Sequence, residues 1–108
     1  MDKEIYKLHA KICKSLSSPI RLEVLDLLRE RERSVRDMVA STGTSQPNLS
    51  LHLKQMWENG VLARRQEGSV VYYRVSDPEV FDAIDIFRRI LSKKLSREHQ
   101  LAKGRVRR

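Results

Sequence analysis

The middle of the chain constrains its fold most, because it has the pattern of two short helices joined by a tight turn. Ser34 and Asp37 are spaced as in the capping box that opens a helix. Gly43 can end that helix, because glycine readily adopts the left-handed conformation found there. The connection Gly43-Thr44-Ser45 is three residues long. A glycine-containing turn of this length between two helices predicts a helix-turn-helix.

The second of these helices is predicted to have one apolar and one polar side. Ser45 is expected to cap it through its hydroxyl, and Pro47 is tolerated because amides in the first turn have no intrahelical acceptor. The inward residues recur at helical spacing and are Leu49, Leu53 and Met56. Gly60 is expected to end the helix. A short helix with polar groups near its N-terminus suits insertion into the major groove of DNA.

The outward side of this helix is therefore the candidate DNA-reading surface. Its predicted DNA contacts are Ser45, Gln46, Asn48, Ser50, Leu51 and Lys54. The amides of Gln46 and Asn48 favour adenine. Leu51 points almost directly outward, so it is either an incidental exposed leucine or a contact to a thymine methyl group, and its central place favours the second. His52 lies toward the buried side and is expected to orient the helix by a hydrogen bond.

A β-hairpin is predicted over residues 62–75, because valine and tyrosine are enriched there around a glycine-containing turn at residues 67–69. Arg64 and Arg65 are adjacent as the chain enters this hairpin, and Ser69 lies in its turn. We expect these three residues to contact DNA, with the arginines binding phosphates.

Further amphipathic helices are predicted on both sides of this central part. They cover about residues 3–15, residues 19–31 after the cap at Ser18, and residues 78–94. The apolar rows of the first and last helices exceed what so small a core can cover, so they are expected at a dimer interface. The predicted interface residues are Ile5, Leu8, Ile12, Phe81, Ile84, Leu91 and Leu95.

The resulting fold class is mainly α with a small β-hairpin, in the order of a winged helix-turn-helix. One domain is expected over residues 1–96, followed by a basic mobile tail over residues 97–108. That tail supplies four of the eight net positive charges of the 108-residue chain. Such a charge balance favours a polyanionic partner, and double-stranded DNA fits the helix pattern.

Other classes of protein fit the sequence less well. The single cysteine excludes an intrachain disulfide, and neither a membrane-spanning run nor a signal-peptide core is present, so a cytoplasmic protein without membrane contact is expected. An enzyme or a bound cofactor is not expected, because no nucleophile set, phosphate loop or carboxylate pair is visible. A winged helix that binds only proteins is the alternative, and it would predict an acidic or apolar face where Lys54 stands.

Three stretches resemble the ArsR-type winged-helix transcriptional repressors. They are residues 16–22 (Leu-Ser-Ser-Pro-Ile-Arg-Leu), residues 45–54, and Glu67-Gly68 with Tyr72-Tyr73-Arg74. The resemblance covers about residues 16–95 with order and spacing kept. It implies a homodimer joined through the first and last helices, which binds an imperfect palindromic operator and represses transcription when not ligated. It also implies that the wing reaches the flanking minor groove or backbone.

The ArsR-type repressors often sense a metal, but this chain departs from their ligand patterns. Ser34 and Arg36 stand where thiol-type members place Cys-x-Cys, and neither side chain binds a soft metal. The zinc positions of the last helix hold Asp77, Glu79, Ile90 and Lys93. Because a zinc site needs about four ligands and two of these cannot ligate, no metal site is predicted. The two carboxylates fit helix capping better.

His9 and Cys13 are the remaining sensor candidates. They lie one helical turn apart, and two copies in a dimer could bring two histidines and two thiolates together. The lone cysteine could also respond to oxidants. The alternative, which we favour, is that Cys13 is a small buried hydrophobic residue and that His9 is solvated or lies in the dimer seam.

Overall fold

The computed structural model describes the chain from Met1 to Val106, with side chains as far as Leu101. Two compact units follow each other along the chain, Met1–Pro78 and a second unit that begins at Glu79. Among the predicted tail residues, the side chains of Lys103 and Arg105 and the whole of Arg107 and Arg108 lie outside the described part.

The first unit contains the predicted helices and hairpin. Its elements are α1 (Lys3–Ser15), α2 (Pro19–Leu27), β1 (Arg33–Ser34), α3 (Val35–Thr42), α4 (Gln46–Glu58), β2 (Leu62–Glu67) and β3 (Val70–Val75). The short strand β1 was not predicted, because two residues are too few to show a periodic pattern. It pairs antiparallel with β3, which gives the sheet order β1-β3-β2.

Most of the predicted helix ends are confirmed, but α2 ends at Leu27 and not at about residue 31. The hydroxyl of Ser34 accepts the amide of Asp37 at 3.0 Å, and Gly43 and Gly60 have φ angles of 71° and 83°. The expected cap at Ser45 is wrong in one respect: the residue holds the N-cap position of α4, but its side chain makes no capping hydrogen bond. A cap reaches the second or third amide of a helix, and here the second residue is Pro47, which has no N–H.

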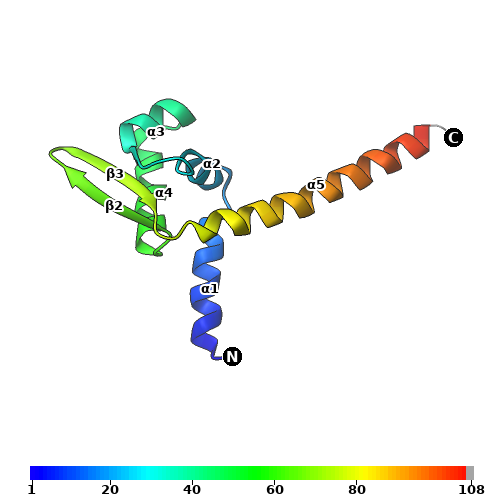
Figure 1. The fold of residues 1–108 in the computed structure, drawn as a ribbon, viewed down its shortest axis with the longest axis horizontal. Helices are drawn as coiled ribbons and strands as arrows, with labels where there is room; N and C mark the ends of the chain where they lie inside the picture. Colours follow the sequence, from blue (N-terminus) through cyan, green and yellow to red (C-terminus); the bar gives the residue numbers. More distant parts are fainter. Residues whose placement is uncertain (107–108) are drawn as a thin grey trace. The chain divides into compact units, whose positions relative to one another are not determined.

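The core of the first unit lies where α2, α3 and α4 meet the sheet. The three predicted inward residues of α4, Leu49, Leu53 and Met56, are fully buried. They are joined by Val24, Leu25, Met38, Leu62 and Tyr73. The hairpin of β2 and β3 extends beside α4 (Figure 1). The core therefore fixes the rotation of α4, which leaves the opposite side of that helix exposed.

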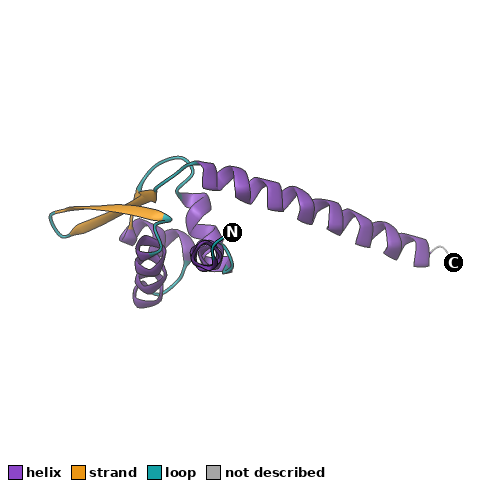
Figure 2. Cartoon of the chain, turned by 90° about the horizontal axis from the view of Figure 1, so that it is seen from below, coloured by secondary structure: helices purple, strands orange, loops and turns teal. Residues whose placement is uncertain are grey.

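The second unit is the helix α5, Glu79–Val106, drawn without a break in Figure 2. The predicted helix end at about Lys94 is wrong, and the helix continues into the segment that we expected to be a mobile tail. No glycine or proline stands between Glu79 and Lys103, and most residues after Lys94 are good helix formers. None of the helices in the described part of the chain is long and apolar enough to cross a membrane.

Candidate nucleic-acid interface

The outward side of α4 carries the predicted DNA contacts. Ser45, Gln46, Asn48, Leu51 and Lys54 are exposed, and Ser50 is partly buried. The side chain of Leu51 is 54% exposed, which agrees with the orientation expected from helical periodicity. The Nζ atom of Lys54 lies 4.0 Å from a carboxylate oxygen of Glu58 on the next turn. This side of the helix is thus polar, with one apolar residue at its centre.

A buried arginine of α2 holds α4 in place. Arg21 is only 5% exposed, and its Nε donates a hydrogen bond to Nδ1 of His52 at 3.0 Å. Its Nη2 donates to the side-chain oxygen of Gln55. Burial and the nearby positive charge of Arg21 lower the pKa of His52 from its ordinary value of 6.5. The expected orienting hydrogen bond of His52 is present, and its partner is the residue that sequence reasoning missed.

Arg64 lies on the side of the hairpin that faces α4. Its guanidinium carbon is 3.5 Å from the centre of the Trp57 ring, a cation–π arrangement. Within the described residues, Arg64 makes no ion pair. Its positive charge therefore remains available to an anion from outside the chain.

Arg65 lies on the opposite side of the hairpin, because side chains alternate along a strand. Its Nε donates to both carboxylate oxygens of Glu32, at 3.0 and 3.1 Å, and its Nη1 donates to Glu67 at 2.8 Å. The guanidinium also lies over the ring of Tyr72, 4.3 Å from the ring centre. These hydrogen bonds raise the pKa of Arg65 and lower that of Glu32. Glu32 and Glu67 thus already balance the positive charge of Arg65, the second arginine that was predicted to contact a phosphate.

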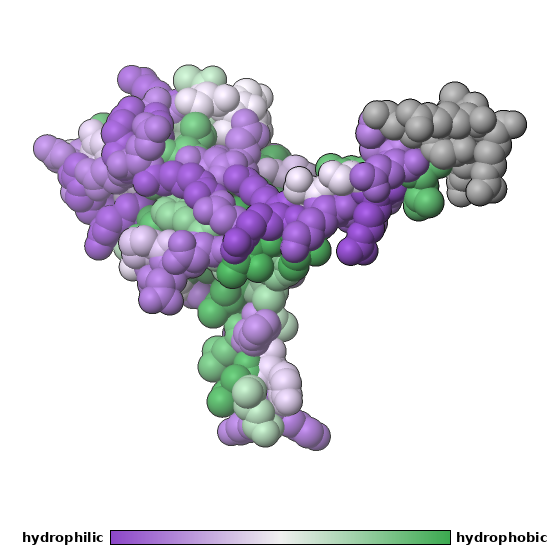
Figure 3. All heavy atoms as spheres, turned by 45° about the vertical axis from the view of Figure 1, so that its right-hand side comes forward, coloured by the Kyte–Doolittle hydropathy of each residue, from purple (hydrophilic) through white to green (hydrophobic). Residues whose placement is uncertain are grey.

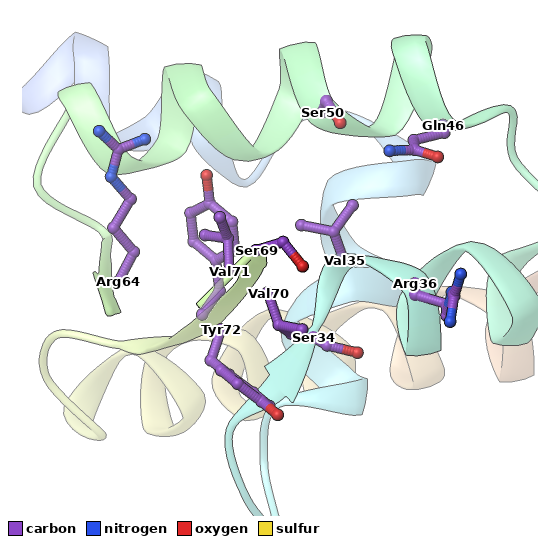
Figure 4. Close-up of a pocket in the computed structure, with 11 residues that line it drawn as sticks. Ser34, Val35, Arg36, Gln46, Ser50, Arg64, Ser69, Val70, Val71 and Tyr72 are labelled. Atoms are coloured by element: carbon purple, nitrogen blue, oxygen red, sulfur yellow. The ribbon is translucent and has the colours of Figure 1, made fainter. Parts of the chain in front are cut away.

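A groove of about 600 Å³ lies between α3, α4 and the hairpin. Figure 4 shows Arg64 and Arg36 toward opposite ends of this groove, with valine side chains from α3 and the hairpin between them. The groove brings together four of the predicted DNA contacts, namely Gln46, Ser50, Arg64 and Ser69. Arg36, which stands where thiol-type members place a metal-binding cysteine, lines the same groove.

The sensor candidates lie on α1. His9 and Cys13 are both exposed, so the expectation that Cys13 is buried is wrong for the single chain. The reason is that α1, described over its whole length, has only Ser15 buried. Among the described residues, no group of three or more His, Cys, Asp or Glu side chains is placed to hold a metal ion.

Apolar side chains are exposed along both α1 and α5. Ile5, Leu8 and Ile12 are about half exposed, and hydrophobic residues follow α1 in the space-filling view (Figure 3). On α5 the large exposed apolar residues are Ile86, Phe87, Ile90, Leu91, Leu95 and Leu101. Of the other predicted interface residues on α5, Ile84 is 3% exposed and Phe81 is partly buried in the single chain, and their place in the interface stays a prediction. Helical spacing alone does not distinguish burial within a chain from burial against a second copy.

Known proteins are similar to this chain in both sequence and fold. Residues 18–63 match the family described as "Bacterial regulatory protein, arsR family". The HTH-type transcriptional regulator Rv0081 of Mycobacterium tuberculosis is 36% identical over 93 residues, which cover 85% of this chain and 82% of that protein. The crystal structure of Rv0081 matches with a TM-score of 0.78 and 33% identity, over 90% of this chain and 98% of that chain.

Two further proteins agree with this assignment. The arsenical resistance operon repressor of Staphylococcus aureus is 35% identical over 79 residues, which cover 73% of this chain and 76% of that protein. The solution structure of the homodimeric winged helix-turn-helix DNA-binding domain of Mb0332 from Mycobacterium bovis matches with a TM-score of 0.77 and 26% identity, over 87% of each chain. The chain therefore belongs to the arsR family of bacterial regulatory proteins and is a winged helix-turn-helix transcriptional regulator.

Proposed function

We propose that this protein is a homodimeric repressor that binds an imperfect palindromic operator in double-stranded DNA. The observation that carries this proposal is the exposed polar side of α4, beside a groove whose two arginines have no acidic partner among the described residues. A related protein is named as the repressor of the arsenical resistance operon, which supports repression over activation. We place the protein in the cytoplasm, and it acts by binding DNA and not by catalysing a reaction.

Base reading in this proposal belongs to the N-terminal half of α4. Gln46 and Asn48 are exposed in its first turn, where an amide can pair with the edge of adenine. Leu51 follows on the same side, and its exposed side chain suits the methyl group of thymine, the apolar feature of the major groove. We therefore infer half-sites that contain A·T base pairs.

The second copy of the chain is proposed to cover the apolar faces of α1 and α5. Exposed rows such as Ile5, Leu8 and Ile12 on α1, and Leu91 and Leu95 on α5, cost free energy in water and mark interfaces. The related domain of Mb0332 is homodimeric, which supports the same assembly here. A two-fold dimer presents two copies of α4 to two half-sites of a palindrome.

The proposal is tested by selecting bound duplexes from a pool of random sequence. We expect the selected DNA to share an inverted repeat and to remain bound in a gel-shift assay when random competitor DNA is in excess. Sedimentation without DNA should give a dimer at micromolar protein. If no sequence is enriched and every duplex competes equally well for the protein, binding is only non-specific and the proposal is wrong.

A further inference from the structure

The groove between α3, α4 and the hairpin concentrates positive charge. Arg36 and Arg64 line it toward opposite ends, and no acidic side chain is among the described residues of its lining. A concave surface lined by one sign of charge focuses the electric field and attracts ions of the other sign. The ligand of this groove is therefore expected to be an anion.

The two lining arginines differ from most other arginines of the first unit. Three arginines nearby have acidic partners at hydrogen-bond distance: Arg29 with Asp26 at 2.9 Å, Arg33 with Asp37 at 3.2 Å, and Arg65 with Glu32 and Glu67. Arg36 makes no hydrogen bond or ion pair within the described residues, and Arg64 contacts only the Trp57 ring. Their two charges are thus available to a ligand, whereas the charge of Arg65 is already matched.

The neutral groups of the groove suit phosphate oxygens. The hydroxyls of Ser50 and Ser69 and the amide of Gln46 lie along the lining and can donate hydrogen bonds. An elongated site with a cation toward each end matches successive phosphates of one strand better than it matches a single small anion. Gln46 and Ser50 also belong to α4, so the strand in the groove would border the major groove that this helix enters.

We propose that the groove holds the sugar–phosphate backbone of one DNA strand, with Arg36 and Arg64 each contacting a phosphate and Arg65 contacting none. This inference rests on the proposed DNA-binding function. It adds Arg36 of α3 to the DNA contacts and removes Arg65 from the phosphate contacts that the sequence predicted. Arg65 becomes a residue that positions the hairpin through Glu32 and Glu67.

The experiment measures how binding to a short duplex of random sequence depends on salt. The slope of log K against log salt concentration is negative, and each lost phosphate contact decreases its magnitude by about 0.9. We expect this decrease for Arg36→Gln and for Arg64→Gln. The control Arg65→Gln should keep the wild-type slope even where a looser hairpin lowers the affinity, because the slope counts phosphate contacts. Arg36→Lys and Arg64→Lys should retain the wild-type slope, because a phosphate needs only the charge. Thermal unfolding should show Arg36→Gln to be as stable as wild type, because Arg36 is exposed and its substitution removes no hydrogen bond or ion pair within the described residues.

The outcomes separate this proposal from the proposed function. If the wild type binds duplexes with a salt-dependent affinity but Arg36→Gln has the wild-type slope, the groove proposal is wrong and the proposed function stands. The groove proposal is also wrong if Arg65→Gln decreases the magnitude of the slope as much as Arg64→Gln does.

Inorganic phosphate, titrated without DNA and followed by NMR, should give no saturable shift at Arg36. Saturable binding that Arg36→Gln abolishes would instead identify a site for a free anion. Failure of the wild type to bind any duplex rejects the proposed function itself.

Discussion

Among single residues, Arg21 and His52 form an unusual contact. A buried guanidinium normally pairs with a carboxylate, but within the described residues the partners of Arg21 are a neutral imidazole and an amide of α4. The Nδ1 atom of His52 can accept the hydrogen bond only when it carries no proton. Protonation would therefore remove the bond and place two positive charges side by side.

This contact makes stability depend on pH. Above pH 6.5, His52 is neutral in both the folded and the unfolded chain, so the contact contributes fully. Below pH 6.5 the unfolded chain takes up the proton first, because the folded-state pKa is lowered, and the folded state loses stability as pH falls through that lowered pKa. Urea unfolding measured on both sides of pH 6.5 should show a smaller loss on acidification for His52→Gln than for wild type. Equal losses would exclude His52 as the source.

Leu51 and Leu53 provide a matched pair of substitutions on one helix. Leu51 is 54% exposed and Leu53 is fully buried. Leu51→Ala should leave unfolding unchanged but weaken operator binding by about 1 kcal/mol, and uracil in place of the contacted thymine should reproduce that loss. Leu53→Ala should lower the free energy of unfolding by about 2–5 kcal/mol. If Leu51→Ala weakens binding to operator DNA and to random DNA equally, the thymine contact is excluded.

At the scale of elements, the hairpin is tied to the rest of the first unit across its whole width. Glu32 precedes β1, and its carboxylate reaches Arg65 on β2 although β3 lies between these strands. Tyr72, opposite Arg65 on β3, supplies the surface over which the guanidinium lies. One ion pair therefore spans all three strands, and we expect it to limit how far the hairpin can bend.

Removing the Glu32 carboxylate should change both the motion of the hairpin and the salt dependence of DNA binding. Glu32→Gln is expected to loosen the hairpin, which hydrogen exchange would report as faster exchange of the β2 amides. It should also free part of the charge of Arg65, so that the salt dependence of DNA binding becomes steeper than in wild type. The control Glu58→Gln, in which Lys54 loses a distant partner at 4.0 Å, should leave β2 exchange unchanged. Unchanged exchange in Glu32→Gln would show that the ion pair does not restrain the hairpin.

The sequence predicted those parts of the fold and site that depend on neighbouring residues. The caps at Ser34 and Gly43 and the outward direction of Leu51 follow from short spacings along one helix. The different environments of Arg64 and Arg65 could not be predicted, because the partner Glu32 lies more than thirty residues away in the sequence. The same holds for Arg21 and His52, and for β1, which exists only because β3 is beside it.

In the whole molecule, operator binding is expected to need two copies of the chain acting together. The exposed apolar rows of α1 and α5 have no function in a monomer and carry a solvation cost there. Replacing Leu8 and Ile12 by lysine should therefore shift sedimentation from dimer to monomer and weaken operator binding far more than binding to a single half-site. A double variant that stays dimeric would exclude α1 from the interface.

Two-fold binding of DNA can be measured with duplexes that differ only in the distance between two half-sites. A two-fold dimer fixes the separation of its two α4 helices, so the selected operator should be bound tightly when its half-sites are about 10 base pairs apart. Inserting about five base pairs turns one half-site to the other side of the duplex and should reduce the affinity to that of a single half-site. Equal affinity for all spacings would show that the protein does not bind DNA as a two-fold dimer with a fixed separation of its α4 helices.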